Sequence, residues 1–411
     1  MKYTKLKIVV IFLAILLIVG IIGIVVVYGK YTDVKIAANN SVQTNLIGNT
    51  DVSNVQNSSD TGSTAYSNEL IDLKEWEQNS KEIPDYKGIY FELPIKGTTG
   101  YASIESNIRT AGNESAEVIK KIKPGTAFEI LEEQGNWFKI DLDGETGWIS
   151  TKYCMVNLPD LIPSIVYDDT NAYSSIFKSS EIDIPNVTGK QLYNNRKYNK
   201  RLSKDEFMMP VIYAMAKKIM KAQEQALEDG YSLKIYETYR PYEAQKLVGD
   251  NLRNLMNSNK TVYNGIYGGG WNQGWFIAQV LSNHQRGIAM DVSLVKINDY
   301  EVKETGNYKY MSITDYTEEK MPTKMHELSN KAISLTRPVD SNSKTAWKNV
   351  PLAKGMTDGA IRLRNYCVAA DLSPLCSEWW HFNDLDARED IGKNYSTGRY
   401  YITECCSESP N

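Results

Sequence analysis

The chain is poor in cysteine, in histidine and in excess positive charge, and each shortage excludes a class of protein. Its 411 residues include five Cys and three His, and 46 Lys and Arg stand against 50 Asp and Glu. An odd number of cysteines without zinc-ligand spacing excludes a disulfide framework and a cysteine zinc site, and leaves open only a Cys367–Cys376 bridge. A net charge of −4 gives no sign of a nucleic-acid surface, so we expect no nucleic-acid partner.

Two of the three histidines lie in two short segments that also carry carboxylates. The first segment runs from Ser282 to Asp291 and reads Ser-Asn-His-Gln-Arg-Gly-Ile-Ala-Met-Asp; the second, Ser-Glu-Trp-Trp-His, ends at His381. Together they offer two imidazoles, one carboxylate ligand and one spare carboxylate. A catalytic zinc site needs three protein ligands, an open position for water and a base beside it. For either segment alone, the alternative is a buried His–Asp hydrogen bond without a metal.

The residues around the first histidine favour this geometry. Residues 288–294 alternate and are rich in aliphatic and β-branched residues, which predicts a strand on which Ala289 and Asp291 face the same side. The small Ala289 leaves room for a metal. Gly287 allows a sharp turn, so His284 can fold back toward Asp291.

The second segment has an ambiguous local structure. Glu378 and His381 are three residues apart, which places them on one face of a helical turn but on opposite faces of a flat strand. Because Pro374 and two Trp disfavour a long helix, we predict a bent extended segment.

A third segment, Tyr239-Arg240-Pro241, completes a resemblance to a known family. The pattern Ser-x-His-x-x-Gly-x-Ala-x-Asp followed by Glu-x-Trp-His resembles the zinc D-Ala-D-Ala peptidases, relatives of lysostaphin and of the hedgehog signalling domain. The doubled Trp points to the D-alanyl-D-alanine dipeptidase branch, and the resemblance covers roughly residues 160–395. It implies one zinc ion held by three ligands, which are His284, Asp291 and His381. It also implies that Glu378 is the catalytic base and that Arg240 stabilises the transition state. Ser282, two residues before a ligand, is expected to contact the substrate.

The N-terminal residues predict a membrane anchor. Residues 8–28 are apolar and uncharged, about the 20 residues that a helix needs to cross a bilayer. Three Lys precede them, so residues 1–29 are expected to form a single-pass anchor in the cell membrane with the catalytic domain extracellular. A cleaved signal peptide is the alternative, but its apolar core is usually about 7–15 residues. Residues 30–87, dominated by Asn, Ser and Thr, predict a disordered extracellular linker.

Short β-like runs separated by glycine turns fill residues 88–157. Examples are 127–131, 137–140 and 147–149, and this spacing predicts a small antiparallel barrel. The motifs Asn-Ile-Arg, Lys-Pro-Gly, Gly-Asn-Trp and Gly-Trp-Ile are similar to those of bacterial SH3-like domains, which often bind cell-wall peptides. The alternative is a spacer whose Trp residues lie in its core. We expect the barrel to be independent of the catalytic chemistry.

Residues 158–400 are expected to form the peptidase domain, followed by a tail at 401–411. Ser203 and Glu206 suggest a capping box and a helix after it, although Pro210 favours a start one turn later. Residues 231–237 predict a strand that ends just before Arg240. His326 lies in a helix-like stretch of a polar insertion, so we expect a surface residue and not a fourth ligand.

These features predict an α+β protein. Its zinc peptidase domain has an antiparallel sheet flanked by helices, and a small all-β SH3-like barrel and an N-terminal transmembrane helix precede it. The expected activity is zinc-dependent hydrolysis of D-Ala-D-Ala type bonds in cell-wall metabolism. The alternatives are a membrane-anchored D,D-carboxypeptidase acting on peptidoglycan stems, and a non-catalytic wall-binding protein on the same scaffold. The expected partners are a D-Ala-D-Ala-containing peptide or peptidoglycan stem, the cell wall through the barrel, and the membrane through the N-terminal helix.

Overall fold

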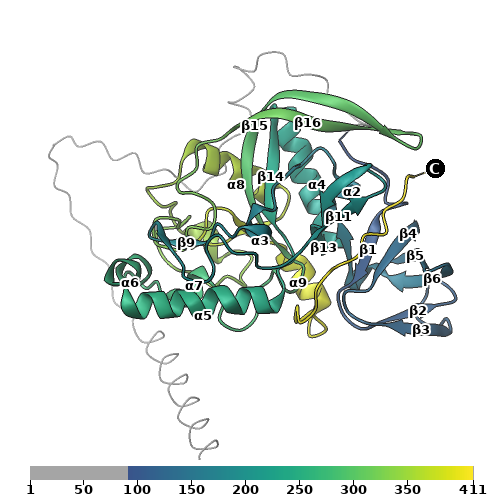
Figure 1. Ribbon diagram of the computed structural model, residues 1–411, viewed down its shortest axis with the longest axis horizontal. Helices are drawn as coiled ribbons and strands as arrows, with labels where there is room; N and C mark the ends of the chain where they lie inside the picture. Colours follow the sequence, from purple (N-terminus) through teal and green to yellow (C-terminus); the bar gives the residue numbers. More distant parts are fainter. Residues whose placement is uncertain (1–90, 411) are drawn as a thin grey trace, which may run out of the picture. The chain divides into compact units, whose positions relative to one another are not determined.

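The computed structural model describes residues 91–410, which contain two principal β-sheets (Figure 1). The predicted fold is corrected in one respect. Among these residues, no helix is long and apolar enough to cross a membrane. The architecture of residues 91–410 therefore contains no transmembrane helix. The segment for which it was predicted, residues 8–28, and the predicted linker at 30–87 lie outside the described residues.

The predicted barrel is present. Its strands are β1 (Thr99–Ala102), β2 (Ser106–Arg109), β3 (Val118–Ile122), β4 (Ala127–Gln134), β5 (Trp137–Leu142), β6 (Glu145–Ser150) and β7 (Cys154–Asn157). Strand β5 alternates half-buried and buried residues, as one solvated face and one core face require. A two-residue Asp143-Gly144 turn, with both residues at positive φ, joins β5 to β6. Trp137 and Trp148 are only half-buried, so they do not form the core that the spacer alternative expected.

The barrel sheet continues into residues 158–400, the predicted peptidase region. Strand β13 (Pro210–Ile212) pairs antiparallel with β7, which gives an eight-stranded sheet in the order β13-β7-β1-β4-β5-β6-β2-β3. Pro210 opens this edge strand, where its missing N–H costs no ladder hydrogen bond. Beside it, the Tyr213 ring packs on Phe138, 4.9 Å between centroids, and its hydroxyl donates to Glu133 Oε2 over 2.6 Å. The barrel and the peptidase region are therefore structurally continuous.

The C-terminal residues also return to the barrel. Ser407, 1% exposed, lies 2.7 Å from Thr99 Oγ1 of β1 and donates to Asp160 Oδ2 over 2.5 Å. The Glu408 amide donates to the Gly97 carbonyl over 2.9 Å. Figure 1 shows this last segment passing along β1. The predicted tail is thus part of the packed structure.

A chain that starts at residue 158 should be much less stable than one comprising residues 91–410. It loses β7 and exposes Val211, which is fully buried in the intact chain, and it removes Phe138 from Tyr213. Exposing a few such side chains costs about 5 kcal/mol or more, a large share of the roughly 5–15 kcal/mol of a typical domain. Thermal unfolding of both chains tests this. Equal melting temperatures would show that the barrel contributes nothing to the stability of the rest of the chain.

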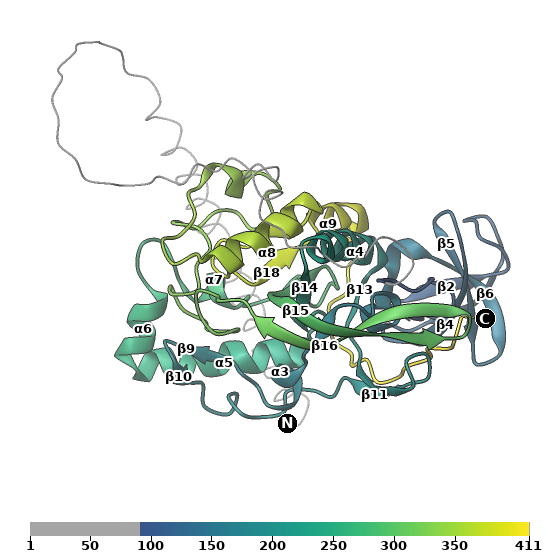
Figure 2. The ribbon, with the colours of Figure 1, turned by 90° about the horizontal axis from the view of Figure 1, so that it is seen from above.

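The second sheet carries the peptidase region. Its order is β17 (Ser373–Pro374), β18 (His381–Asn383), β15 (Ala289–Thr305), β14 (Tyr231–Glu237) and β8 (Val166–Tyr167), and β16 (Tyr308–Glu318) also pairs with β15. The pairs are antiparallel, as predicted, except for the parallel β8–β14 pair. Helices α4 (Tyr213–Glu228) and α8 (Asp358–Ala369) pack on this sheet. In Figure 2, α5 (Tyr242–Ser258) lies on the other side of these strands.

The remaining elements are short. They are α2 (Leu158–Leu161), α3 (Thr170–Tyr173), α6 (Lys260–Ile266), α7 (Gln273–Phe276) and α9 (Leu385–Ile391), the 3-10 turns at Thr151–Tyr153 and Ala346–Asn349, and the ladders β9 (Lys178–Ser179) with β10 (Ile182–Asp183) and β11 (Arg196–Asn199) with β12 (Lys204–Phe207).

Two local predictions have different outcomes. The strand predicted for residues 231–237 is confirmed as β14. The capping box is wrong, because Ser203 has a φ of 53° and Glu206 lies in strand β12. The helix begins only at Tyr213, because Pro210 disfavours an earlier helical start.

Candidate active site

Strand register brings three of the acidic and imidazole side chains into one row. Glu237 of β14 lies opposite Asp291 of β15, and Asp291 lies opposite His381 of β18. Side chains of directly opposed residues share a face of the sheet about 4.5–5.5 Å apart. The row therefore follows from pairing between segments far apart in the chain.

His284 reaches the row from a tight turn. Gly287 has a φ of 71°, and its carbonyl accepts from the Ile212 amide of β13 over 2.7 Å. A Cβ at Gly287 would lie 2.8 Å from Met155 Sδ of β7, so only glycine fits both the conformation and the space. The barrel strands thus support the turn that carries His284.

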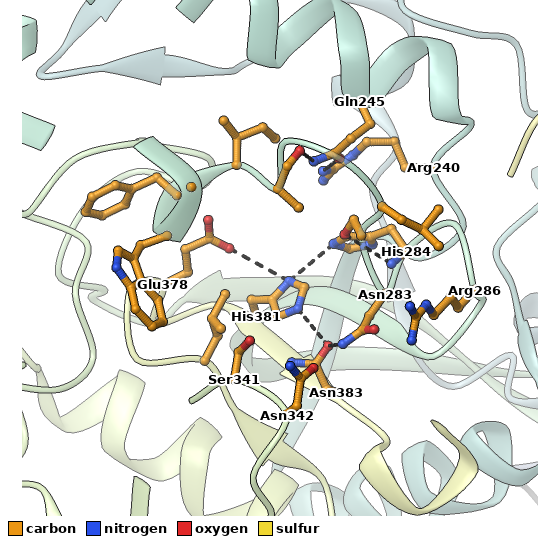
Figure 3. Close-up of a pocket in the computed structure, with 18 of the residues that line it drawn as sticks. Arg240, Gln245, Asn283, His284, Arg286, Ser341, Asn342, Glu378, His381 and Asn383 are labelled. Carbon is orange, nitrogen blue, oxygen red and sulfur yellow. Dashed lines mark hydrogen bonds and ion pairs between the residues drawn. The ribbon is translucent and has the colours of Figure 1, made fainter. Parts of the chain in front are cut away.

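The structure brings His284, Asp291 and His381 together, all buried. Figure 3 shows the two imidazoles facing each other. His284 Nε2 is 3.2 Å from His381 Nδ1 and 3.3 Å from Asp291 Oδ1, and His381 Nδ1 is 2.9 Å from the same oxygen. Ligand atoms about 2.0–2.1 Å from a tetrahedral zinc lie about 3.3–3.4 Å apart. The three observed separations are close to that value.

The outer hydrogen bonds of both imidazoles support a cation between them. His284 Nδ1 lies 2.6 Å from the Thr238 carbonyl, which can only accept, so this nitrogen carries the proton. His381 Nε2 lies 3.0 Å from Asn383 Oδ1, an oxygen that also accepts from Asn283 Nδ2. The other two ring nitrogens, His284 Nε2 and His381 Nδ1, then present lone pairs toward the Asp291 carboxylate. Three acceptors facing one another fit a metal ion, and the outer partners fix the rings as second-layer groups do.

The electrostatic environment keeps two of these groups, His284 and Asp291, in ligand form. For His381, burial is outweighed by the hydrogen bond to Asp291 and by the charge of that carboxylate, so the pKa of this imidazole is raised. Burial lowers the pKa of His284, which favours the neutral imidazole. Burial opposes ionisation of Asp291, but the neighbouring imidazoles, His284 first, hold the pKa of Asp291 well below its usual range. A neutral imidazole and an ionised carboxylate are the forms that bind metals.

Arg240 is anchored beside the three groups. Its Nη2 donates to Glu237 Oε2 over 2.5 Å and to Asp291 Oδ2 over 2.9 Å, and Nη1 donates to Gln245 Oε1 over 2.8 Å. These bonds use three of the five guanidinium N–H groups, and the buried Nε has no partner within residues 91–410. Two of its N–H groups, one on Nε and one on Nη1, therefore have no partner among these residues.

A second acidic group close by has a different character. Glu237, Asp291 and His326 also converge, but the Arg240 guanidinium lies between the two carboxylates. Glu237 further accepts from Asn171 Nδ2 and the Tyr193 hydroxyl, over 3.1 and 2.6 Å. This group is an ion-pair network that holds Arg240, and it does not fit a second metal.

The prediction that His326 is a surface residue is wrong. It is 1% exposed, has a φ of 59°, stacks on Phe177, and its Nε2 donates to Asp291 Oδ2 over 2.9 Å. Sequence reasoning also missed Glu237 and Gln245. For His326, the one available signal was the small number of histidines, because all three histidines of the chain lie within this site.

Glu378 and Ser282 line a cavity of about 250 Å³ that opens on Arg240, His284 and His381. Glu378 Oε2 is 3.8 Å from His381 Nδ1, and burial raises the pKa of Glu378 to about 8. A carboxyl with a raised pKa can both accept and return a proton near neutral pH. The Ser282 hydroxyl accepts from the His284 amide over 3.3 Å, which ties it to the turn.

Comparison with known proteins identifies the class of this protein. The site lies within residues 172–398, which match the model of a peptidase family. The matched residues make up more than half of the chain, and the chain belongs to the family described as D-Ala-D-Ala dipeptidase. Residues 102–154 match the bacterial SH3 domain, as the barrel motifs predicted.

One curated relative has a cell-wall function in its name. The chain is 32% identical over 80 residues to the putative N-acetylmuramoyl-L-alanine amidase YrvJ of Bacillus subtilis (strain 168). The match covers 19% of this chain and 14% of the relative, so the chain spans only a small part of that protein's length.

Proposed function

We propose that this protein is a zinc peptidase that hydrolyses D-Ala-D-Ala type bonds in cell-wall peptides. The observation that carries the proposal is the set of three inward-facing donor atoms beside Glu378, in a chain of the D-Ala-D-Ala dipeptidase family. His284, Asp291 and His381 would hold the ion. When bound, zinc lowers the pKa of a water molecule toward about 7 and polarises a carbonyl.

The protein side chains supply the proton transfers and the charge stabilisation. The Glu378 carboxylate takes a proton from the attacking water and delivers it to the leaving amine, a role that its position on the cavity wall permits. The unused N–H groups of Arg240 donate to the oxygen that gains charge in the transition state. One such donor is worth about 2.7–4 kcal/mol. Ser282 contacts the substrate from the cavity wall.

The barrel supports a wall location for this reaction. Its family match, and the name of the curated relative, are consistent with a protein that works on peptidoglycan. Trp137 and Trp148 are partly exposed and offer flat aromatic surface to a ligand. We propose that the barrel binds wall material and that the reaction takes place outside the cytoplasm.

Two substrates are compatible with the proposal: free D-Ala-D-Ala, or a longer peptidoglycan stem that ends in this pair. A non-catalytic role on the same scaffold is disfavoured, because Glu378 and the three donor atoms are all in place.

Release of D-Ala by purified residues 91–410 tests the function. We expect cleavage of D-Ala-D-Ala or of a pentapeptide ending in it, no cleavage of L-Ala-L-Ala, and about one zinc per chain. The ratio of the rates on dipeptide and pentapeptide separates the dipeptidase from the carboxypeptidase. Metal-loaded protein that releases D-Ala from neither substrate would refute the proposal.

A further inference from the structure

A second cavity adjoins the active-site cavity. It has a volume of about 620 Å³ and shares three lining residues with the first: Arg286, Asn342 and Arg388. The first cavity, at about 250 Å³, is below the roughly 300–1,000 Å³ typical of sites for drug-sized ligands. It suits a small terminal unit, and the second cavity offers space for a continuation of the same ligand.

The wall shared by the two cavities carries two arginines without acidic partners. Within residues 91–410, neither Arg286 nor Arg388 forms an ion pair, and the buried Arg286 Nε has no hydrogen-bond partner. The Arg286 guanidinium lies 4.2 Å from the centre of the Tyr395 ring, and Arg388 Nη1 donates to Asn342 Oδ1. Both side chains are therefore held in place by neutral groups.

The other charged residues of the second cavity do not neutralise this pair. Lys344 binds Glu389 and Asp386 of α9, so the only acidic lining residue, Glu389, is already engaged over 2.6 Å. Among the described residues, three cations and one anion line the cavity, and Asp386 also pairs with Lys344 from outside the lining, so the net positive charge there comes from the two arginines. The two arginines also repel each other, which contributes to a lowered pKa of Arg286 after the larger effect of its burial. An anion between them would relieve that repulsion.

Arg286 lies away from the proposed base. In Figure 3, Arg286 and Glu378 are on opposite sides of the His284 and His381 rings. A peptide that places its scissile bond at the imidazoles, beside Arg240, can extend past Arg286 into the second cavity.

We propose that Arg286 and Arg388 form a binding subsite for a carboxylate carried by the residues that precede the terminal D,D pair of a longer peptide. This inference rests on the proposed function and selects its substrate class: acidic stem peptides over the free dipeptide. Arginine is suited to the role because its planar N–H groups match a carboxylate in pairs.

Matched peptides test the subsite. Acetylated peptides ending in D-Ala-D-Ala carry either Glu or Gln at the first or the second residue before the pair, and kcat/KM is measured for each. We expect the intact protein to favour a Glu peptide over its Gln counterpart by about tenfold or more, as for a charge-assisted hydrogen bond. In Arg286→Gln and Arg388→Gln the ratio should fall toward one, and in Arg253→Gln, an exposed arginine outside both cavities, it should not change.

A salt series on the unmodified protein gives a second measurement that does not depend on how the variants fold. The Glu-over-Gln preference should shrink as ionic strength rises, because partly exposed charges are screened. Equal rates on Glu and Gln peptides at both positions would overturn the subsite while leaving the D,D-peptidase intact. Cleavage of no D,D-peptide at all would overturn the function and the subsite together.

Discussion

Glu378→Gln is expected to lower kcat by about 10²- to 10⁴-fold, the usual contribution of a general acid–base group. The amide keeps the size of the side chain but can neither take a proton from water nor return it to the leaving amine. The zinc content should stay at the level of the unmodified protein, since Glu378 is 3.8 Å from His381 Nδ1 and belongs to neither convergent group of donor atoms.

The experiment pairs steady-state kinetics with metal analysis. Glu243→Gln is the control, because Glu243 is exposed on the first turn of α5 and does not line the cavity. It should retain normal kcat and metal content. If Glu378→Gln turns over at the normal rate, the base is another residue. If it loses its zinc, Glu378 acts as a ligand and the three-ligand assignment is wrong.

Asp291→Asn should abolish stoichiometric zinc binding and also destabilise the fold. One oxygen of Asp291 faces the imidazole pair, and the other accepts from Arg240 and His326. The amide would offer Arg240 and His326 only an uncharged oxygen and leave Arg240 with Glu237 as its remaining carboxylate partner. Breaking a buried charge pair on one side costs about 3–5 kcal/mol, which corresponds to a fall in Tm of about 10 °C for a domain of this size.

The chelator-treated unmodified protein is the matched control for Asp291→Asn. It lacks the metal but keeps the carboxylate, so it reports the loss of ligand binding alone. Asp291→Asn should melt below this metal-free protein by most of the predicted shift. Identical melting temperatures would mean that the Arg240–Asp291–His326 contacts contribute little, and normal zinc content in the variant would remove Asp291 from the ligand set.

The sequence predicted what depends on local pattern. Alternating apolar residues located β14 and the start of β15, and the glycine turns of the barrel fell where the hairpins form. The site residues were accessible because two histidine segments and Arg240 follow a recognisable pattern. The role of each as ligand, base or stabiliser stays a prediction that the metal and kinetic experiments above address.

The features that the sequence did not predict depend on contacts between distant segments. His326 lies in a stretch with helical periodicity, but the neighbouring Glu327 carboxylate accepts from the backbone amides of Ser180 and Glu181, and these bonds hold a non-helical turn. The β7–β13 pair joins strands of four and three residues. Pairs this short leave no periodic signal from which their adjacency could be inferred.

The return of the last residues to β1 has a consequence for how the chain folds. Thr99 and Ser407 are 308 residues apart in sequence, and contacts of such separation slow folding because a long loop must close before they form. During synthesis, β1 can pair with β4 and β7 early, but its contact with Ser407 must wait until nearly the whole chain has been made. The barrel then completes its packing last, although it is translated first. A fusion partner or charge introduced near Ser407 should therefore affect the yield of folded protein more than its activity once folded.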